Sequence, residues 1–138
     1  MSTVITPNDA ELEMLETILN YDYTFHLYKN NHTPSRNSTL ADFEEASFVG
    51  YSSYSLGKIS ISESGWLYAP YLEDNVAVAD HDIYSWTCTS TEVQTVYGYY
   101  ITSDTTNQVI LAEKFNSIQL MNCNIFSLGF QIRLYNES

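Results

Sequence analysis

The spacing of hydrophobic residues changes once along the chain, near residue 20. From Pro7 to Leu19 the apolar residues recur every three or four positions, which is typical of one face of a helix. This stripe consists of Leu12, Leu15, Ile18 and Leu19. Thr6 and Pro7 supply an N-cap and a first helical residue, and Asn20 is expected to end the helix in the left-handed conformation. Because three turns are marginal alone in water, the stripe must pack on the chain's own core or on a neighbouring subunit.

After residue 20 the hydrophobic spacing becomes two, which predicts a strand over 21–28. Segment 40–48 is expected to form one or two helical turns with Ser38 or Thr39 as cap. The segment around Pro70 is expected to be extended and to lie at a sheet edge. Further strands are predicted over 58–62, 83–89, 93–102, 109–115 and 125–135, with a turn over 103–107.

These elements predict a mainly β fold. The strands do not alternate with helices, so a parallel doubly wound sheet is disfavoured. We expect an antiparallel β-sandwich or small barrel of about seven strands with an N-terminal amphipathic helix. Residues 1–20 form the helical arm in this interpretation, and residues 21–138 form the β-sandwich domain.

The composition of the chain limits the classes of partner that it can bind. The chain has 138 residues, enough for one domain, and its 17 acids and 5 bases give a net charge of -12. This charge argues against binding to nucleic acid or to anionic membranes. The sequence contains no apolar run of about 20 residues, the length that spans a bilayer, and no basic segment typical of a signal peptide at the N-terminus. Cys88 and Cys123 are expected to be buried thiols, with one disulfide as the alternative.

No motif indicates catalysis, so we expect no enzyme activity and no cofactor. The residues from Asp80 to Asp82 are the nearest approach to a metal site, but the patterned oxygen ligands of a calcium loop are absent; a solvated acidic loop is the preferred interpretation, and no metal is expected. The histidines and serines lie outside known nucleophile motifs. Trp66, Tyr68 and Tyr71 could form an aromatic platform for a sugar, although such rings more often belong to a core or an interface.

Six segments follow one another along the chain in a specific order. They are Glu11–Leu15, Tyr23–Pro34, Leu40–Tyr51, Trp86–Thr89, Val96–Ile101 and Leu111–Phe115. In this order they resemble a family of small virion structural proteins of tailed bacteriophages and their prophages. The resemblance covers nearly the whole chain.

The resemblance implies a capsid decoration (cement) protein that binds and stabilises the outer capsid lattice. The implied partners are the major capsid protein and further copies of the chain, with a homotrimer favoured, and the implied location is the outer capsid surface after synthesis in the host cytoplasm. A receptor- or carbohydrate-binding module of the tail is the alternative. The residues expected to make the contacts are Leu12, Leu15, Ile18, Leu19, Trp66, Tyr68 and Tyr71.

Overall fold

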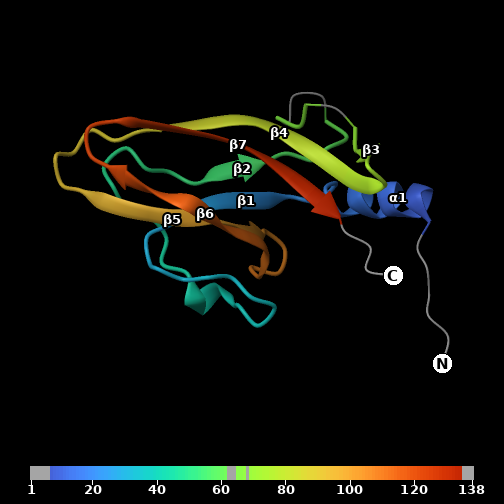
Figure 1. Cartoon of the computed structure of the whole chain (residues 1–138), viewed down its shortest axis with the longest axis horizontal. Coiled ribbons are helices and arrows are strands. Elements are labelled where there is room, and N and C mark those ends of the chain that lie inside the picture. The colour runs from blue at the N-terminus through green and yellow to red at the C-terminus, as the bar shows by residue number, and fades with distance from the viewer. Residues whose placement is uncertain (1–6, 62–64, 68, 135–138) are drawn as a thin grey trace. The chain divides into compact units, whose positions relative to one another are not determined.

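The structure is a computed structural model that describes residues 7–61, 65–67 and 69–134. It is mainly β, with seven antiparallel strands in two sheets and one α-helix, as the sequence predicts. The elements in chain order are α1 (Asn8–Ile18), β1 (Tyr23–Tyr28), the 3-10 helix η1 (Leu40–Asp42), β2 (Tyr54–Leu56), β3 (Tyr71–Glu73), β4 (Val76–Thr87), β5 (Gln94–Ser103), β6 (Val109–Met121) and β7 (Ile125–Leu134) (Figure 1).

The chain divides into two compact units. The sandwich unit comprises residues 22–56 and 84–128, and the helix unit comprises residues 1–21, 57–83 and 129–138. One sheet has the strand order β2-β1-β5-β6, and the other has the order β3-β4-β7. The expected division into an arm over 1–20 and a β-domain over 21–138 stays a prediction.

The core of the sandwich unit is aromatic. Phe25 of β1 is fully buried, and its ring lies 4.8 Å from Tyr99, 5.6 Å from Tyr84 and 6.0 Å from Trp86. The Trp86 ring also lies 5.7 Å from Phe126, and its indole N–H donates to the Ser52 carbonyl at 2.8 Å. Residues of the two sheets thus pack face to face within this unit, as in a β-sandwich.

A second cluster covers the opposite face of the four-stranded sheet. Tyr28, Phe43 and Tyr100 are buried together, with the Phe43 ring 4.8 Å from Tyr100 and 5.1 Å from Tyr28. Phe43 follows η1, whose capping box joins Thr39 and Asp42. The predicted cap is therefore confirmed, although the helical segment is a single 3-10 turn.

Burial raises the pKa of several tyrosines in these clusters above the ordinary value of about 10. The pKa of Tyr28 rises to about 12 and that of Tyr84 to about 12, in both cases chiefly through desolvation. Desolvation is also the first cause of the raised pKa values of Tyr51, Tyr99 and Tyr100. These five residues, the raised-pKa tyrosines, are held neutral in the folded protein.

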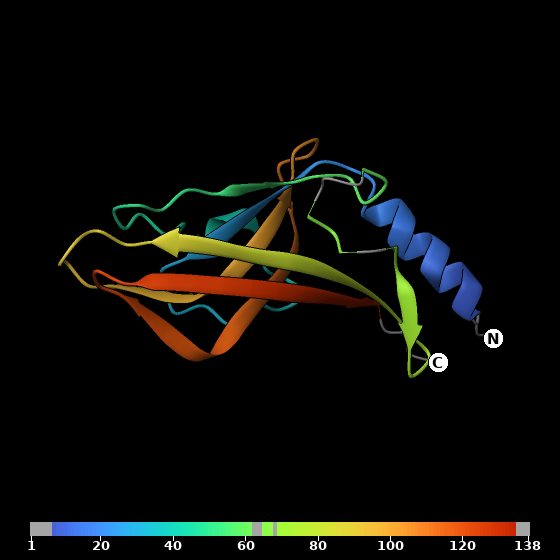
Figure 2. The ribbon, with the colours of Figure 1, turned by 90° about the horizontal axis from the view of Figure 1, so that it is seen from above.

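The helix unit is built around α1, which begins and ends within one residue of the predicted bounds. Leu15 and Leu19 are 1% exposed, so this part of the stripe is buried within the chain itself. α1 contacts β3, and both views show the two elements side by side (Figures 1 and 2). Pro7 is the N-cap residue in an extended conformation, and the predicted cap Thr6 lies outside the described residues. Asn20 is not left-handed, which contradicts the prediction. The helix ends instead with a tighter last turn, in which the Asn20 N–H donates to the Thr17 carbonyl at 3.3 Å.

A tight hairpin joins β3 to β4. Asp74 and Asn75 both have positive φ, at 51° and 64°, and Glu73 pairs directly with Val76 across them. Two left-handed residues form the mirror-image turn that matches strand twist, and Asp and Asn tolerate this conformation. β3 is an edge strand that begins directly after Pro70. The segment expected to be extended at an edge is 65–71, so the strand overlaps it only at Tyr71, and Trp66 forms an isolated bridge with His81.

Two segments differ from the predictions. Residues 58–61 form a turn rather than a strand, held by the Ile59 N–H, which donates to the Leu19 carbonyl at the end of α1. Residues 80–82 are not a solvated loop but the middle of β4. There His81 is 5% exposed, its ring stacks on Phe130 at 4.9 Å, and Asp80 accepts hydrogen bonds from Tyr71 and Gln131.

The two cysteines are free thiols in different environments. Cys88 is buried as predicted. Cys123 is exposed, which contradicts the prediction, because it occupies the turn between β6 and β7 with a φ of 48°. Its N–H donates to the Ser90 carbonyl at 3.0 Å, which fixes the turn while the side chain faces solvent.

Candidate functional site

Six of the seven predicted contact residues lie in the described part of the helix unit, with very different exposure. Leu15 and Leu19 are buried, Leu12 is half-buried, and Ile18 is 39% exposed. The face of α1 that retains exposed apolar surface therefore includes Ile18 and its neighbour Met14, which is 48% exposed. That the stripe binds a partner stays a prediction.

The predicted aromatic platform is partly buried. Trp66 is 7% exposed and donates from its indole nitrogen to the Gly57 carbonyl at 3.0 Å. Its ring also contacts His81 and Phe130 edge-on. Tyr71 is half-buried and donates to Asp80 at 2.7 Å, and Tyr68 lies outside the described residues. Trp66 is thus a core residue of the helix unit, which is the more frequent of the two roles weighed for it.

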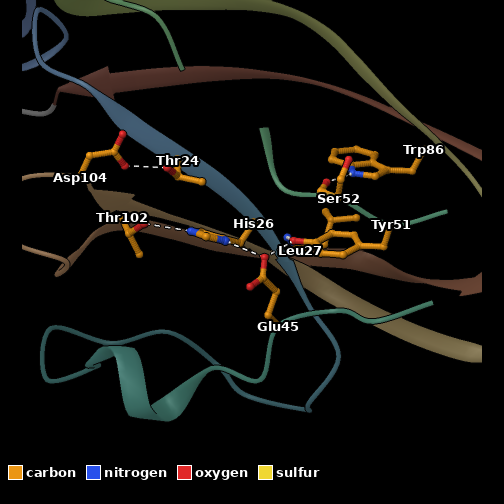
Figure 3. Close-up of polar contacts among 9 residues, drawn as sticks. All are labelled: Thr24, His26, Leu27, Glu45, Tyr51, Ser52, Trp86, Thr102 and Asp104. Carbon is orange, nitrogen blue, oxygen red and sulfur yellow. Dashed lines mark hydrogen bonds and ion pairs between the residues drawn. The ribbon is translucent and has the colours of Figure 1, made fainter. Parts of the chain in front are cut away.

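A polar cluster that sequence reasoning missed lies on the outer face of the four-stranded sheet. The Nδ1 atom of His26 lies 2.7 Å from Oε2 of Glu45, and its Nε2 atom lies 2.9 Å from the Thr102 hydroxyl (Figure 3). His26 and Thr102 come from the neighbouring strands β1 and β5, where His26 pairs with Tyr100. The imidazole stacks on the Tyr100 ring at 4.6 Å, which fixes its plane.

Glu45 also joins the cluster to the segment that follows η1. The Tyr51 hydroxyl donates to Glu45 Oε2 at 2.5 Å and accepts the Leu27 N–H at 3.2 Å. Burial and the hydrogen bond to Glu45 raise the pKa of Tyr51, so this hydroxyl remains a donor. The Ala46 N–H donates to the Leu27 carbonyl, and the Lys29 N–H donates to the Glu44 carbonyl. The segment that follows η1 is therefore also bonded to the end of β1 through the backbone.

The order of carboxylate, imidazole and hydroxyl is that of a hydrolytic triad. A triad needs an accessible nucleophile beside a substrate site, whereas Thr102 is only 5% exposed. The cavities of about 180 to 390 Å³ found on the surface are lined by other residues. Charge-assisted hydrogen bonds of this kind stabilise by about 1.5–3 kcal/mol each. The cluster of His26, Glu45, Tyr51 and Thr102, which we call the clasp, therefore holds segment 43–51 on the sheet.

The described residues offer no group of metal-ligating side chains, in agreement with the free cysteines and the buried His81. None of their helices has the length and apolar character needed to cross a membrane.

Exposed apolar side chains lie at one end of the sandwich unit, on or beside three turns that are bonded to one another. We call Val49, Val93, Leu120 and Ile125 the tip surface. Their side chains are 57% to 67% exposed. The Thr89 N–H donates to the Val49 carbonyl, and the Cys88 N–H donates to the Asn124 carbonyl, so the three turns are tied together. Figures 1 and 2 both show these turns gathered beyond the strand ends of the unit.

Comparison with known proteins identified no relative: no family model, curated protein or solved structure matches the chain.

Proposed function

We propose that this chain is a non-enzymatic structural protein of a tailed-phage virion, and that it binds and stabilises the outer capsid lattice as a decoration protein. The observation that supports a structural role is the tip surface, four exposed apolar side chains that are available for contact with another protein chain, on a protein of net charge -12. Exposed apolar groups that cluster in this way are typical of protein contact sites. The placement in a virion rests on the sequence resemblance.

Features of the fold support a contact role over the alternatives. The hydroxyl of the hydroxyl–imidazole pair in Figure 3 belongs to Thr102, which is buried, and this disfavours that pair as a hydrolytic site. The carbohydrate-binding alternative needs exposed rings for stacking on a sugar, and the burial of Trp66 removes the largest of them. A β-sandwich with a rigid aromatic core can instead present surface repeatedly on a lattice.

Copy number in purified virions tests the proposal. A capsid decoration protein follows the lattice and is present in hundreds of copies, whereas a tail module is present in about a dozen copies or fewer. Quantified gel bands, normalised to the major capsid protein, separate the two. Particles that lack the protein altogether would overturn the virion assignment.

A second arm tests the stabilising role. Particles made without this protein should lose their genome at a lower temperature than decorated particles, and adding back the purified chain should restore the wild-type temperature. Identical release temperatures with and without bound protein would contradict a cementing function.

A further inference from the structure

The segments that build the end of the sandwich unit are almost free of charge. Residues 46–53, 85–95 and 115–128 contain one charged residue, Glu92, although the whole chain has 17 acids and 5 bases. Four of the six large hydrophobic side chains exposed on the described part of this unit form the tip surface. Apolar exposure therefore coincides with low charge, and Glu92, the one acid of these segments, lines the same cavity as Val49 and Val93.

The turns under the tip surface are held by bonds to one another. The Asn122 N–H donates to Asn124 Oδ1 at 2.7 Å, and the Asn124 amide donates to the Leu120 carbonyl at 3.2 Å. The Ser47 N–H donates to Gln94 Oε1 at 2.8 Å, which joins the first turn to β5. Because these backbone groups are paired, the turns are already ordered, and binding would cost little further backbone entropy.

We infer that the tip surface is the self-association site, and that its occupant is the tip surface of a second copy of this chain. This inference rests on the proposed function and names the partner for one surface of the protein. Two copies with a net charge of -12 repel each other wherever their acids meet. The tip is where two copies can touch with the least repulsion, while a basic partner would gain more from the acidic surfaces elsewhere.

The size of the tip surface sets the strength of the contact. Stable interfaces bury about 1,200–2,000 Å² in total, and four side chains with a few neighbours fall short of that. We therefore expect a weak, concentration-dependent oligomer, with dissociation constants between about 1 µM and 1 mM. In a lattice, contacts of this strength act together through high local concentration.

Sedimentation equilibrium of the purified chain, over about 1 µM to 1 mM protein, measures the association directly. Ile125→Asp should raise the dissociation constant at least about tenfold, because it places like charges opposite each other in an apolar contact. The matched control is Ile83→Asp, since Ile83 is 64% exposed and Ile125 is 67% exposed, but Ile83 belongs to the helix unit. The control should associate as the wild type does.

Salt and a thiol probe supply independent readouts. Raising salt to about 1 M screens the repulsion between copies, so association should strengthen or stay constant. A short bis-maleimide should link two chains through Cys123, which is exposed, and should leave buried Cys88 unmodified. The linked dimer should vanish in Cys123→Ser and decrease at least fivefold in Ile125→Asp.

Circular dichroism checks that each variant folds, and Val93→Asp, on a different turn of the tip surface, replaces Ile125→Asp if that variant unfolds. A wild type that stays monomeric up to about 1 mM overturns the inference, as does equal weakening by Ile83→Asp. If Ile125→Asp abolishes binding to particles while self-association is unchanged, the tip contacts the capsid protein and the inference is wrong. These outcomes leave the virion copy number, and hence the proposed function, independently measurable.

Discussion

Removal of the Phe25 ring is the sharpest test of the sandwich core. Phe25 is fully buried and touches three aromatic rings at 4.8 to 6.0 Å. Truncation of a buried Phe to Ala costs about 3–5 kcal/mol, and the lost ring pairs place Phe25→Ala in the upper part of this range. A loss of about 4 kcal/mol lowers the melting temperature of a domain of this size by roughly 12–20 °C. Phe25→Leu, which keeps most of the volume, should lose less than half as much free energy.

Urea unfolding followed by circular dichroism and tryptophan fluorescence gives the free energies. Tyr21→Ala is the control, because its ring is 56% exposed and its loss should cost no more than about 0.5 kcal/mol. The comparison requires equal m-values, so that a shift of the midpoint reports stability alone. A cost below about 1 kcal/mol for Phe25→Ala, or no difference from the control, would refute the packing described for this core.

Four further outcomes follow from the contacts. A Cβ atom at Gly98 would overlap the Glu113 carbonyl oxygen in the β5–β6 ladder, so Gly98→Ala should cost about 2–4 kcal/mol in urea unfolding. Among the described residues, Glu11 Oε2 is a buried oxygen without a hydrogen-bond partner, so Glu11→Met should stabilise by about 1–2 kcal/mol, and a loss of stability would contradict this. Glu45→Gln weakens two charge-assisted bonds of the clasp and should cost about 1–2 kcal/mol, with His26 ring signals in NMR reporting the change. The raised-pKa tyrosines lose protons more readily when unfolded, so stability should be full below about pH 10 and fall as the pH rises towards 12; an unchanged urea midpoint at about pH 11 would oppose this.

Local pattern predicted the elements whose periodicity is strong. The stripe from Leu12 to Leu19 located α1 to within one residue at each end. Alternation located β1, except that the strand begins at Tyr23 and leaves Tyr21 exposed. The polar run over 103–107 is the turn between β5 and β6, as predicted, with Asn107 in the left-handed conformation at a φ of 56°.

Where the sequence pattern predicted the wrong structure, contacts with residues distant along the chain determine the structure. The alternation over 58–62 predicts a strand, but Ile59 bonds instead to the end of α1. The acids at 80 and 82 suggested a loop, yet Asp80 is satisfied by Tyr71 and Gln131, which allows a polar residue inside β4. Glu11 is not part of the apolar stripe, yet it is 3% exposed. Sequence alone shows none of these partners, because they are distant along the chain.

The clasp could not be predicted from the sequence either. Its members are separated by 19 residues between His26 and Glu45, and by 76 residues between His26 and Thr102. No motif records such spacings, since the pairing of β1 with β5 creates them. One feature of the tip surface can be seen in the sequence. The segment from Phe115 to Ile132 has no charged residue, in a chain with 22 charged residues, 17 acidic and 5 basic.

The burial of the helical stripe changes which surface is suited to which partner. Leu15 and Leu19 stabilise the helix unit, so a partner that used them would have to open that unit first. The exposed side of α1 carries Met14 together with the exposed acids Glu13 and Glu16, and it would attract a basic partner and repel a second copy. The tip surface has the opposite character, because its apolar contact between copies needs no counter-charge. High salt should therefore weaken contacts made through the helix and preserve those made through the tip, so that one salt titration of decorated particles separates the two surfaces.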